Sequence, residues 1–264
     1  MFTVTLDRLR TLSVSTRDFR FTREDGETTR YEPGQFFRFV FEDAEGEFER
    51  SYSLCNFEEL YSEHLDLVIS RVDGGRATRL LFDCEAGLRA RVTGPFGRLT
   101  LPATLPGRLF LVATSVGLAP YMPILKALES GLNETGDCQV ILLLGVRDRS
   151  EFIYGEQLLD YRQRNPWFEL RLCLSREPAS AGHERDGYVT DQLAGFDPDT
   201  TTDHFLLCGN PAMVDEAYAR LKLSGFGPRQ VIREKYVFAR EKKAASEPSD
   251  EQKKLIAEKM KKYT

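Results

Sequence analysis

A short polar run, Arg50-Ser51-Tyr52-Ser53, holds three kinds of side chain that together suit one large ligand. An arginine fork can donate two hydrogen bonds to a phosphate, a tyrosine ring can lie along a flat ring, and a serine hydroxyl can donate to a ring nitrogen. The run lies between two strand-like stretches, 36–41 and 65–70, so we expect a strand. Because side chains alternate faces in a strand, Ser53 reaches the ligand of Arg50 and Tyr52 only through a local twist or bulge. An ordinary sheet strand with exposed polar residues is the alternative.

A second polar segment, Gly74-Gly75-Arg76-Ala77-Thr78, opens a predicted helix at 75–82. The free backbone N–H groups and the positive end of a helix can hold a phosphate. Two glycines before a helix also fit a plain turn. The place of this segment, after Arg50 and before Gly94-Pro95-Phe96-Gly97, favours the phosphate site.

The elements that must position these residues differ between the two halves of the chain. Residues 1 to about 100 form short strand-like runs separated by turn residues, which predicts a closed antiparallel barrel. From about residue 108, apolar strands alternate with helices, which predicts a doubly wound parallel sheet with its ligands at the carboxyl ends of the strands. The expected strands are 2–12, 19–22, 35–41, 50–55, 65–72, 88–93, 109–113, 139–145, 168–175 and 204–208, and the later helices are 121–129, 155–162, 189–194 and 213–223.

Composition limits the class of protein. The 264 residues suffice for two domains, and 41% hydrophobic with 29% charged residues is typical of a soluble globular protein. No apolar run approaches the roughly 20 residues that span a bilayer, and no secretory signal is evident, so we expect no membrane association. The five cysteines are scattered without a CxxC pair, so we expect no metal centre and a cytoplasmic location. The net charge of −5 argues against a nucleic-acid partner.

The order of motifs resembles the ferredoxin–NADP reductase family, and the bacterial type fits best. Arg50-x-Tyr52-Ser53 is followed far downstream by Cys208-Gly209-x-Pro211, and the resemblance covers roughly 2–238. It implies an N-terminal antiparallel six-stranded FAD-binding barrel over 1–101 and a C-terminal doubly wound parallel sheet that binds NADP over 108–238. The remaining segment, 239–264, is a C-terminal extension for which we expect a helix.

The resemblance also implies roles at the FAD. Arg50 contacts phosphate, Tyr52 lies along the isoalloxazine and Ser53 faces flavin N5. Gly75 and Thr78 match the stretch that holds the pyrophosphate. The FAD-binding set that we expect is Arg50, Ser51, Tyr52, Ser53, Gly74, Gly75, Arg76, Ala77 and Thr78.

The loop under the nicotinamide dinucleotide departs from the family pattern. The commonest family form is Gly-Thr-Gly-x-x-Pro, and Thr-Gly-x-Gly-x-Ala-Pro is also found among bacterial members. Against the second form Thr114, Gly117 and Pro120 match, and Ser115 replaces a glycine. The added side chain is expected to crowd the cofactor. Downstream, the resemblance implies a nicotinamide-side cluster and a final aromatic near the flavin, with Tyr236 preferred over Phe238. The cluster residues are Cys208, Gly209, Pro211 and Met213, and Glu234 is the carboxylate that completes the flavin site together with the aromatic.

Cationic and hydroxyl side chains favour NADP over NAD. Ser175 and Arg176 follow a strand where the family's NADP users place Ser-Arg, and Arg147 follows another strand. Arg185 and Tyr188 are expected to close the pocket, with Tyr188 able to stack on adenine. Ordinary surface arginines on loops are the alternative.

A local excess of arginine suggests a docking face for an acidic electron carrier, with a solvated barrel surface as the alternative. Between Arg71 and Arg108, only three acidic residues oppose seven arginines. These arginines are Arg71, Arg76, Arg79, Arg89, Arg91, Arg98 and Arg108.

The function that the resemblance implies is FAD-dependent exchange of electrons between NADPH and ferredoxin or flavodoxin by a monomeric flavoprotein. Ser53, Cys208, Glu234 and Tyr236 are the expected catalytic residues. A reductase component of an oxygenase and a free-flavin reductase are alternatives within the enzymes. A flavin-binding electron-transfer or regulatory subunit without NADPH chemistry is the alternative of another class, and the irregular loop at Ser115 favours it.

Overall fold

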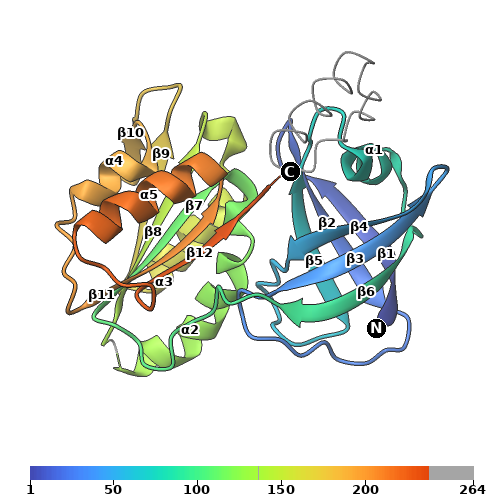
Figure 1. Ribbon diagram of the computed structural model, residues 1–264, viewed down its shortest axis with the longest axis horizontal. Coiled ribbons are helices and arrows are strands. Elements are labelled where there is room, and N and C mark those ends of the chain that lie inside the picture. Colours follow the sequence, from blue (N-terminus) through green and yellow to red (C-terminus); the bar gives the residue numbers. More distant parts are fainter. Residues whose placement is uncertain (136, 238–264) are drawn as a thin grey trace, which may run out of the picture.

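The computed structural model describes residues 1–135 and 137–237, and it divides into a strand-rich part and a part with a helix-covered sheet (Figure 1). Phe238 and the extension 239–264, both named above, lie outside the described residues. The two parts lie side by side, and the last strand runs back toward the first part. No helix in the described ranges has the length and apolarity needed to cross a membrane.

The N-terminal part is a six-stranded antiparallel sheet in the order β4-β3-β6-β1-β2-β5. Phenylalanines at alternating positions of β2 and β3, including Phe19, Phe21, Phe37 and Phe39, fill its interior, because alternate strand residues face the same side. Helix α1 covers one end (Figure 1). The bounds are β1 Phe2–Thr11, β2 Thr16–Arg23, β3 Phe36–Asp43, β4 Gly46–Ser53, β5 His64–Ser70, α1 Arg76–Asp83 and β6 Arg89–Phe96.

The expected six-stranded antiparallel barrel is confirmed, and only its complete closure is wrong. Strands β4 and β5 are the two edges of the sheet, and no strand pairing joins them in the described residues. Among the described residues, the two edges meet only through the segment that follows β4. The Cys55 amide donates to the Asp66 carbonyl of β5 at 2.8 Å, and the Asn56 side chain donates to the His64 carbonyl at 3.0 Å. The barrel is therefore closed at one end and open along β4, which exposes Arg50 and Tyr52 to a ligand.

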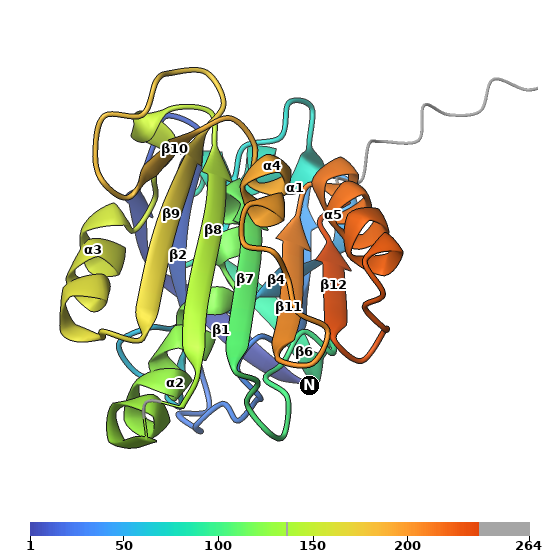
Figure 2. The ribbon, with the colours of Figure 1, turned by 90° about the vertical axis from the view of Figure 1, so that its left-hand side faces the viewer.

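The C-terminal part is a parallel sheet in the order β10-β9-β8-β7-β11-β12. The apolar run of β7 is buried on both faces, since Leu109 and Leu111 pack toward α2 and α3 while Phe110 and Val112 pack toward α4 and α5. Figure 2 shows the sheet with its helices. The bounds are β7 Arg108–Thr114, η1 Ser115–Leu118, α2 Tyr121–Thr135, β8 Gln139–Val146, η2 Arg149–Glu151, α3 Gly155–Arg164, β9 Phe168–Leu174, β10 Glu184–Asp186, α4 Val189–Ala194, β11 Asp203–Gly209, α5 Pro211–Leu223 and β12 Val231–Lys235.

The two parts share an apolar contact. Cys55, Val68 and Leu99 of the barrel region belong to the same buried cluster as the side chains of α2 and α3. Gly34 contributes a close approach to α2, because a Cβ atom there would lie 3.0 Å from the side chain of Ile124. This packing sets the carboxyl ends of β7, β8 and β11 against the open flank of the barrel.

Candidate cofactor-binding site

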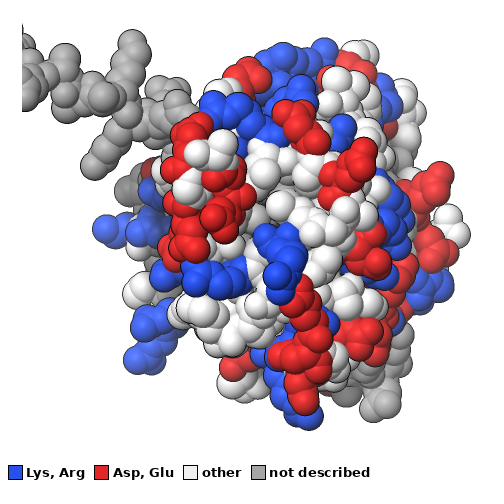
Figure 3. All heavy atoms as spheres, turned by 90° about the vertical axis from the view of Figure 1, so that its right-hand side faces the viewer, with Lys and Arg blue, Asp and Glu red and all other residues white. Residues whose placement is uncertain are grey.

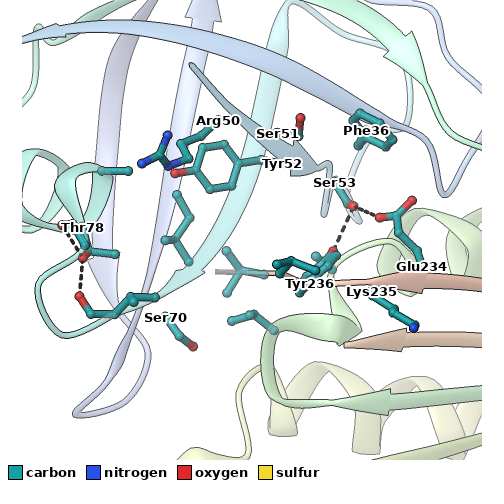
Figure 4. Close-up of a pocket in the computed structure, with 18 of the residues that line it drawn as sticks. Phe36, Arg50, Ser51, Tyr52, Ser53, Ser70, Thr78, Glu234, Lys235 and Tyr236 are labelled. Atoms are coloured by element: carbon teal, nitrogen blue, oxygen red, sulfur yellow. Dashed lines mark hydrogen bonds between the residues drawn. The ribbon is translucent and has the colours of Figure 1, made fainter. Parts of the chain in front are cut away.

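A cavity of about 420 Å³ opens beside β4, where the barrel is not closed (Figure 4). Strand β5, helix α1 and the residues that end β12 form its other walls. Every residue of the expected FAD-binding set except Gly74 lines it. The lining includes Phe36, Arg50, Ser51, Tyr52, Ser53, Ser70, Gly75, Arg76, Ala77, Thr78, Val116, Ala119, Glu234 and Tyr236.

Arg50 and Tyr52 point the same way along β4, as strand alternation requires (Figure 4). The Arg50 guanidinium lies 5.3 Å from the Phe48 ring centroid and donates to the Glu49 carbonyl at 2.7 Å. Among the described residues no carboxylate pairs with Arg50. An unneutralised guanidinium in a cavity wall suits a phosphate.

The start of α1 forms the wall opposite β4. Gly75 is the N-cap without a side-chain cap, so the first amides of the helix have no side-chain acceptor there. The Thr78 hydroxyl donates instead to the carbonyls of Val72, at 2.8 Å, and Gly75, at 3.0 Å, which holds the turn in shape. The Arg76 guanidinium is already paired with Asp43, so its backbone amide at the start of α1 is the group left for a phosphate.

Ser53 lies at the end of β4 and is directed at the C-terminal part rather than along the Arg50 face (Figure 4). Its hydroxyl donates to Glu234 Oε1 at 3.1 Å and accepts from the Tyr236 hydroxyl at 2.9 Å. Burial raises the pKa of Glu234, and the bond from Ser53 offsets part of that rise. Burial also raises the pKa of Tyr236 well above its usual value, so this phenol stays a neutral donor.

Cys208 lies beneath Tyr236 at the end of β11 and is fully buried. Burial raises the pKa of its thiol well above the ordinary value, so it remains a neutral, compact group rather than a thiolate nucleophile. The η1 turn packs tightly on this strand end: a Cβ atom at Gly117 would lie 2.4 Å from the Cys208 carbonyl oxygen. The backbone of Tyr236 completes the contact by donating to the Gly209 carbonyl at 2.9 Å.

A second cavity of about 870 Å³ lies at the carboxyl ends of β7, β8, β9 and β11, where a parallel sheet binds ligands. Thr114 supports the floor of this cavity, because the Thr114 hydroxyl accepts a hydrogen bond from the backbone N–H of Asn210 at 2.9 Å. Ser115 has φ +49°, a left-handed conformation that favours glycine, which is the residue expected there. Of the remaining dinucleotide residues named from sequence, the lining contains Thr114, Arg147, Ser175, Tyr188, Gly209, Met213 and Tyr236.

Several expected dinucleotide residues do not line this cavity. The Arg185 guanidinium donates to the carbonyls of Gly182 and Glu184 at 2.9 and 2.6 Å. Arg176 is exposed on the loop after β9, next to Ser175. Pro211 is the first residue of α5, and Pro120 directly precedes α2, so both act through helix geometry.

The arginine-rich stretch is not an uncompensated basic face. Five of its seven arginines pair with carboxylates that lie elsewhere in the sequence, and Figure 3 shows acidic and basic side chains interspersed on the side of the barrel away from the parallel sheet. The docking face expected from local charge is therefore wrong as a basic patch, because the fold brings acidic residues from other segments beside the arginines. The pairs are Arg76–Asp43, Arg79–Glu45, Arg89–Glu24, Arg91–Glu47 and Arg108–Asp203.

Other lining residues carry no motif and were not found from sequence. Phe36 and Val116 supply apolar surface to the first cavity, beside Ala119 of the loop motif that ends at Pro120. Ser70 lines both cavities, and Glu151 lines the second. Only the contact between the two halves brings these residues together, so residue type and spacing gave no indication of them.

The lining suits FAD. An open-sided cavity next to a free guanidinium and a helix N-terminus accommodates a phosphate-linked flat ring, and the second cavity adjoins it through Tyr236, which lines both. Similarity to known domain families supports this assignment of binding sites. Residues 3–101 match the oxidoreductase FAD-binding domain and residues 111–218 match the oxidoreductase NAD-binding domain.

A curated relative decides the family. Ferredoxin–NADP reductase B of Sorangium cellulosum is 30% identical over 221 residues, which is 81% of this chain and 88% of that protein. The chain belongs to the ferredoxin–NADP reductase family. It is thus an FAD-dependent oxidoreductase with an FAD-binding and an NAD(P)-binding domain, as its motif order predicted.

Other relatives are larger proteins. The reductase subunit of an aromatic O-demethylase from Amycolatopsis is 33% identical over 192 residues, 71% of this chain and 56% of that protein. The chain spans about half the length of such oxygenase reductases. Among solved structures, a ferredoxin NADP+ reductase from Neisseria gonorrhoeae with bound FAD and NADP has a TM-score of 0.74 at 20% identity, covering 88% of this chain and 97% of that one. At this identity the likeness confirms the fold.

Proposed function

We propose that this protein exchanges electrons between NADPH and ferredoxin or flavodoxin, with FAD in the smaller cavity and NADP in the larger. Tyr236 carries this proposal, because it lines both cavities and bonds to Ser53. Two cavities that share a side chain adjoin each other, and a transfer between rings bound in them requires that proximity. On this proposal residues 1–101 form the FAD-binding domain, residues 108–238 form the NADP-binding domain, and 239–264 is an extension.

Bound FAD would accept a hydride at N5 and release electrons singly, which is chemistry that the protein does not itself supply. The protein's part is orientation. Arg50 and the amides at the start of α1 hold the phosphates from opposite walls. Ser53 presents its hydroxyl to the ring edge, and Glu234 holds a proton more readily than an exposed carboxylate does, because burial raises its pKa.

The dinucleotide site is arranged for close approach. Gly117 and Gly209 leave no side chain at the turn under the nicotinamide, and Cys208 stays neutral beside it. With FAD bound, Tyr236 would cover the ring face that the nicotinamide must reach, so its ring would have to move or share space when the dinucleotide binds. We propose NADP rather than NAD, because Arg147 and Ser175 line the cavity while Arg176 adjoins it.

The partner is proposed as a small acidic electron carrier acting on a monomeric reductase. The name of the Sorangium relative supports ferredoxin, and a reductase of the same family from Azotobacter vinelandii is 27% identical over 84% of its length. Flavodoxin remains a second acceptor of the same chemical class, and both are proposed to act in the cytoplasm.

A second candidate function is the reductase component of an oxygenase system. The names of several relatives favour it, including the reductase component of a propane 2-monooxygenase, which is 28% identical over 71% of this chain. The acceptor would then be the iron–sulfur or haem centre of another component. The described residues fit both candidate functions equally well at the flavin site. The two functions differ only in the partner that docks.

Anaerobic reduction tests the proposal. The purified protein is expected to be yellow and to lose its colour with NADPH faster than with NADH, then to reduce ferredoxin or flavodoxin. Yellow protein that ignores both dinucleotides would support a flavin-binding subunit without NADPH chemistry. Reduction by NADPH with transfer only to an oxygenase partner would favour the second candidate.

A further inference from the structure

A row of hydroxyls crosses the boundary between the barrel and the parallel sheet. It begins in the hairpin between β1 and β2, which reaches the turns that follow β7 and β8. We call this row, with the carboxylate at its end, the polar seam. Its members are Ser13, Ser15, Thr16, Ser70, Ser115 and Glu151.

Glu151 anchors one end. Its Oε2 atom accepts from the hydroxyls of Ser13 and Ser15, each at 2.8 Å, although 136 or more residues separate them in sequence. Both bonds are charge-assisted, and such bonds are roughly twice as strong as neutral ones. One carboxylate thus holds the tip of a barrel hairpin against the η2 turn.

The row continues to the dinucleotide loop. Ser15 Oγ lies 3.2 Å from Thr16 Oγ1, which lies 2.8 Å from Ser70 Oγ, which in turn lies 3.5 Å from Ser115 Oγ. Ser15, Ser70, Ser115 and Glu151 also line the larger cavity. The seam is therefore one wall of the proposed dinucleotide site as well as a joint between the two parts.

Ser115 has a conformation that needs an explanation. Its φ of +49° is unfavourable for a residue with a Cβ atom, and glycine would avoid the strain. The hydroxyl that serine adds faces Ser70 of the barrel. A serine in place of glycine at position 115 thus adds a polar contact with Ser70 across the boundary. This contact lies at the turn that supports the nicotinamide end of the proposed site.

We propose that Glu151 and Ser115 are positioning residues, which fix the dinucleotide-binding edge of the parallel sheet against the flavin-binding barrel through the polar seam. The inference rests on the proposed function. The two rings are held by different parts of the chain, so the distance between them depends on how those parts are joined. A displacement of about 1 Å can slow a transfer step about 100-fold.

The test uses full-length FAD-loaded protein. Glu151→Ala removes the acceptor, whereas Glu151→Gln keeps an oxygen that can accept from both serines. The rate of flavin reduction is measured in single turnover at saturating NADPH, and the NADP+ dissociation constant is measured by calorimetry. Hydrogen exchange of the amides at 12–16 reports the joint independently of activity. Glu156→Ala, an exposed carboxylate on α3, is the matched control.

Glu151→Ala and the double variant Ser13→Ala/Ser15→Ala are expected to slow reduction about tenfold and to speed exchange at 12–16, with no added effect when combined. Glu151→Gln should stay within about threefold of wild type. Ser115→Gly keeps the backbone and is expected to slow reduction while NADP+ affinity changes little.

Wild-type rates in Glu151→Ala, or equal losses in the Gln and Ala variants, would overturn the role of Glu151. Unchanged reduction in Ser115→Gly would overturn the role of Ser115. If neither NADPH nor NADH reduced the wild-type protein, that result would contradict the proposed function itself. This outcome separates failure of the proposed function from failure of the polar seam.

Discussion

The Ser53 hydroxyl donates to the Glu234 carboxylate across the boundary between the barrel and the parallel sheet, with Oγ 3.1 Å from Oε1. The two residues are 181 positions apart, and the Tyr236 hydroxyl also donates to Ser53. Ser53 is only 4% exposed, so no bulk water replaces these bonds. Ser53 therefore orients both Glu234 and Tyr236 at the point where the two cavities meet.

Removal of this hydroxyl should affect chemistry more than binding. In Ser53→Ala, Glu234 and Tyr236 lose their shared partner, while the phosphate contacts proposed for Arg50 and α1 are left intact. We expect flavin reduction by NADPH to slow about 10- to 100-fold, with FAD affinity changed less than about threefold. Stopped-flow reduction and FAD titration give the two numbers.

Ser224→Ala provides the control for that experiment, because its hydroxyl caps the end of α5 by donating to the Arg220 carbonyl, away from both cavities. Equal rates in wild type and Ser53→Ala would remove Ser53 from the transfer step.

Arg50 should contribute to FAD affinity and little to stability. Its guanidinium bonds only to the neighbouring Glu49 carbonyl among the described contacts, so Arg50→Ala breaks no ion pair of the fold. Loss of a charge-assisted bond to phosphate costs about 1.5–3 kcal/mol, which is roughly 10- to 150-fold in affinity. Fluorescence titration of the flavin-free protein measures it. Arg91→Ala, on β6 and paired with Glu47, should bind FAD as wild type does; a similar loss in both variants would indicate a general charge effect.

Gly117 should be intolerant of any side chain. A Cβ atom there would meet backbone, the Cys208 carbonyl at 2.4 Å and the Gly209 Cα at 2.8 Å, so no side-chain rotation relieves it. We expect Gly117→Ala to lower the free energy of unfolding by about 1–3 kcal/mol, as other overpacked sites do, and to weaken NADP+ binding. Urea denaturation and calorimetry check both effects.

Gly131→Ala is the matched control, because this glycine lies in α2 and a Cβ atom added there would meet nothing within 4 Å. There the change should stabilise the protein by about 0.5–1 kcal/mol, since alanine is the better helix former. The same sign of effect at both glycines would contradict the steric account of Gly117.

Sequence alone predicted the elements well because their patterns are local. The doubly buried run of β7 and the strand–helix alternation after it follow from hydrophobic periodicity, and α4 has the predicted bounds, Val189–Ala194. The three-residue strand β10 was missed, because Glu184–Asp186 has no apolar pattern and pairs only with β9. The open flank along β4 was also missed, since edge pairing is a property of the whole sheet.

The site was predictable where it depends on motifs and not where it depends on contact between the two halves. Arg50, Tyr52 and Thr78 line the first cavity as expected. The pairing of the surface arginines and the seam at Glu151 require partners distant in sequence, such as Arg89 with Glu24. Residue types do not specify those partners.

Glu234 should make stability depend on pH with a definite sign. Burial raises its pKa above the unfolded value, so the folded state binds the proton more tightly than the unfolded chain does. Its contribution to stability is therefore fully present below the unfolded pKa, near 4.5, and is lost as pH rises through the higher folded pKa.

Glu234→Gln removes this dependence, because a neutral amide does not titrate. We expect the stability of wild type relative to Glu234→Gln to fall as pH rises from about 4 to 8, which urea midpoints at several pH values measure. A constant difference across that range, or one that grows in favour of wild type with rising pH, would show that this carboxyl is ionised without penalty in the fold.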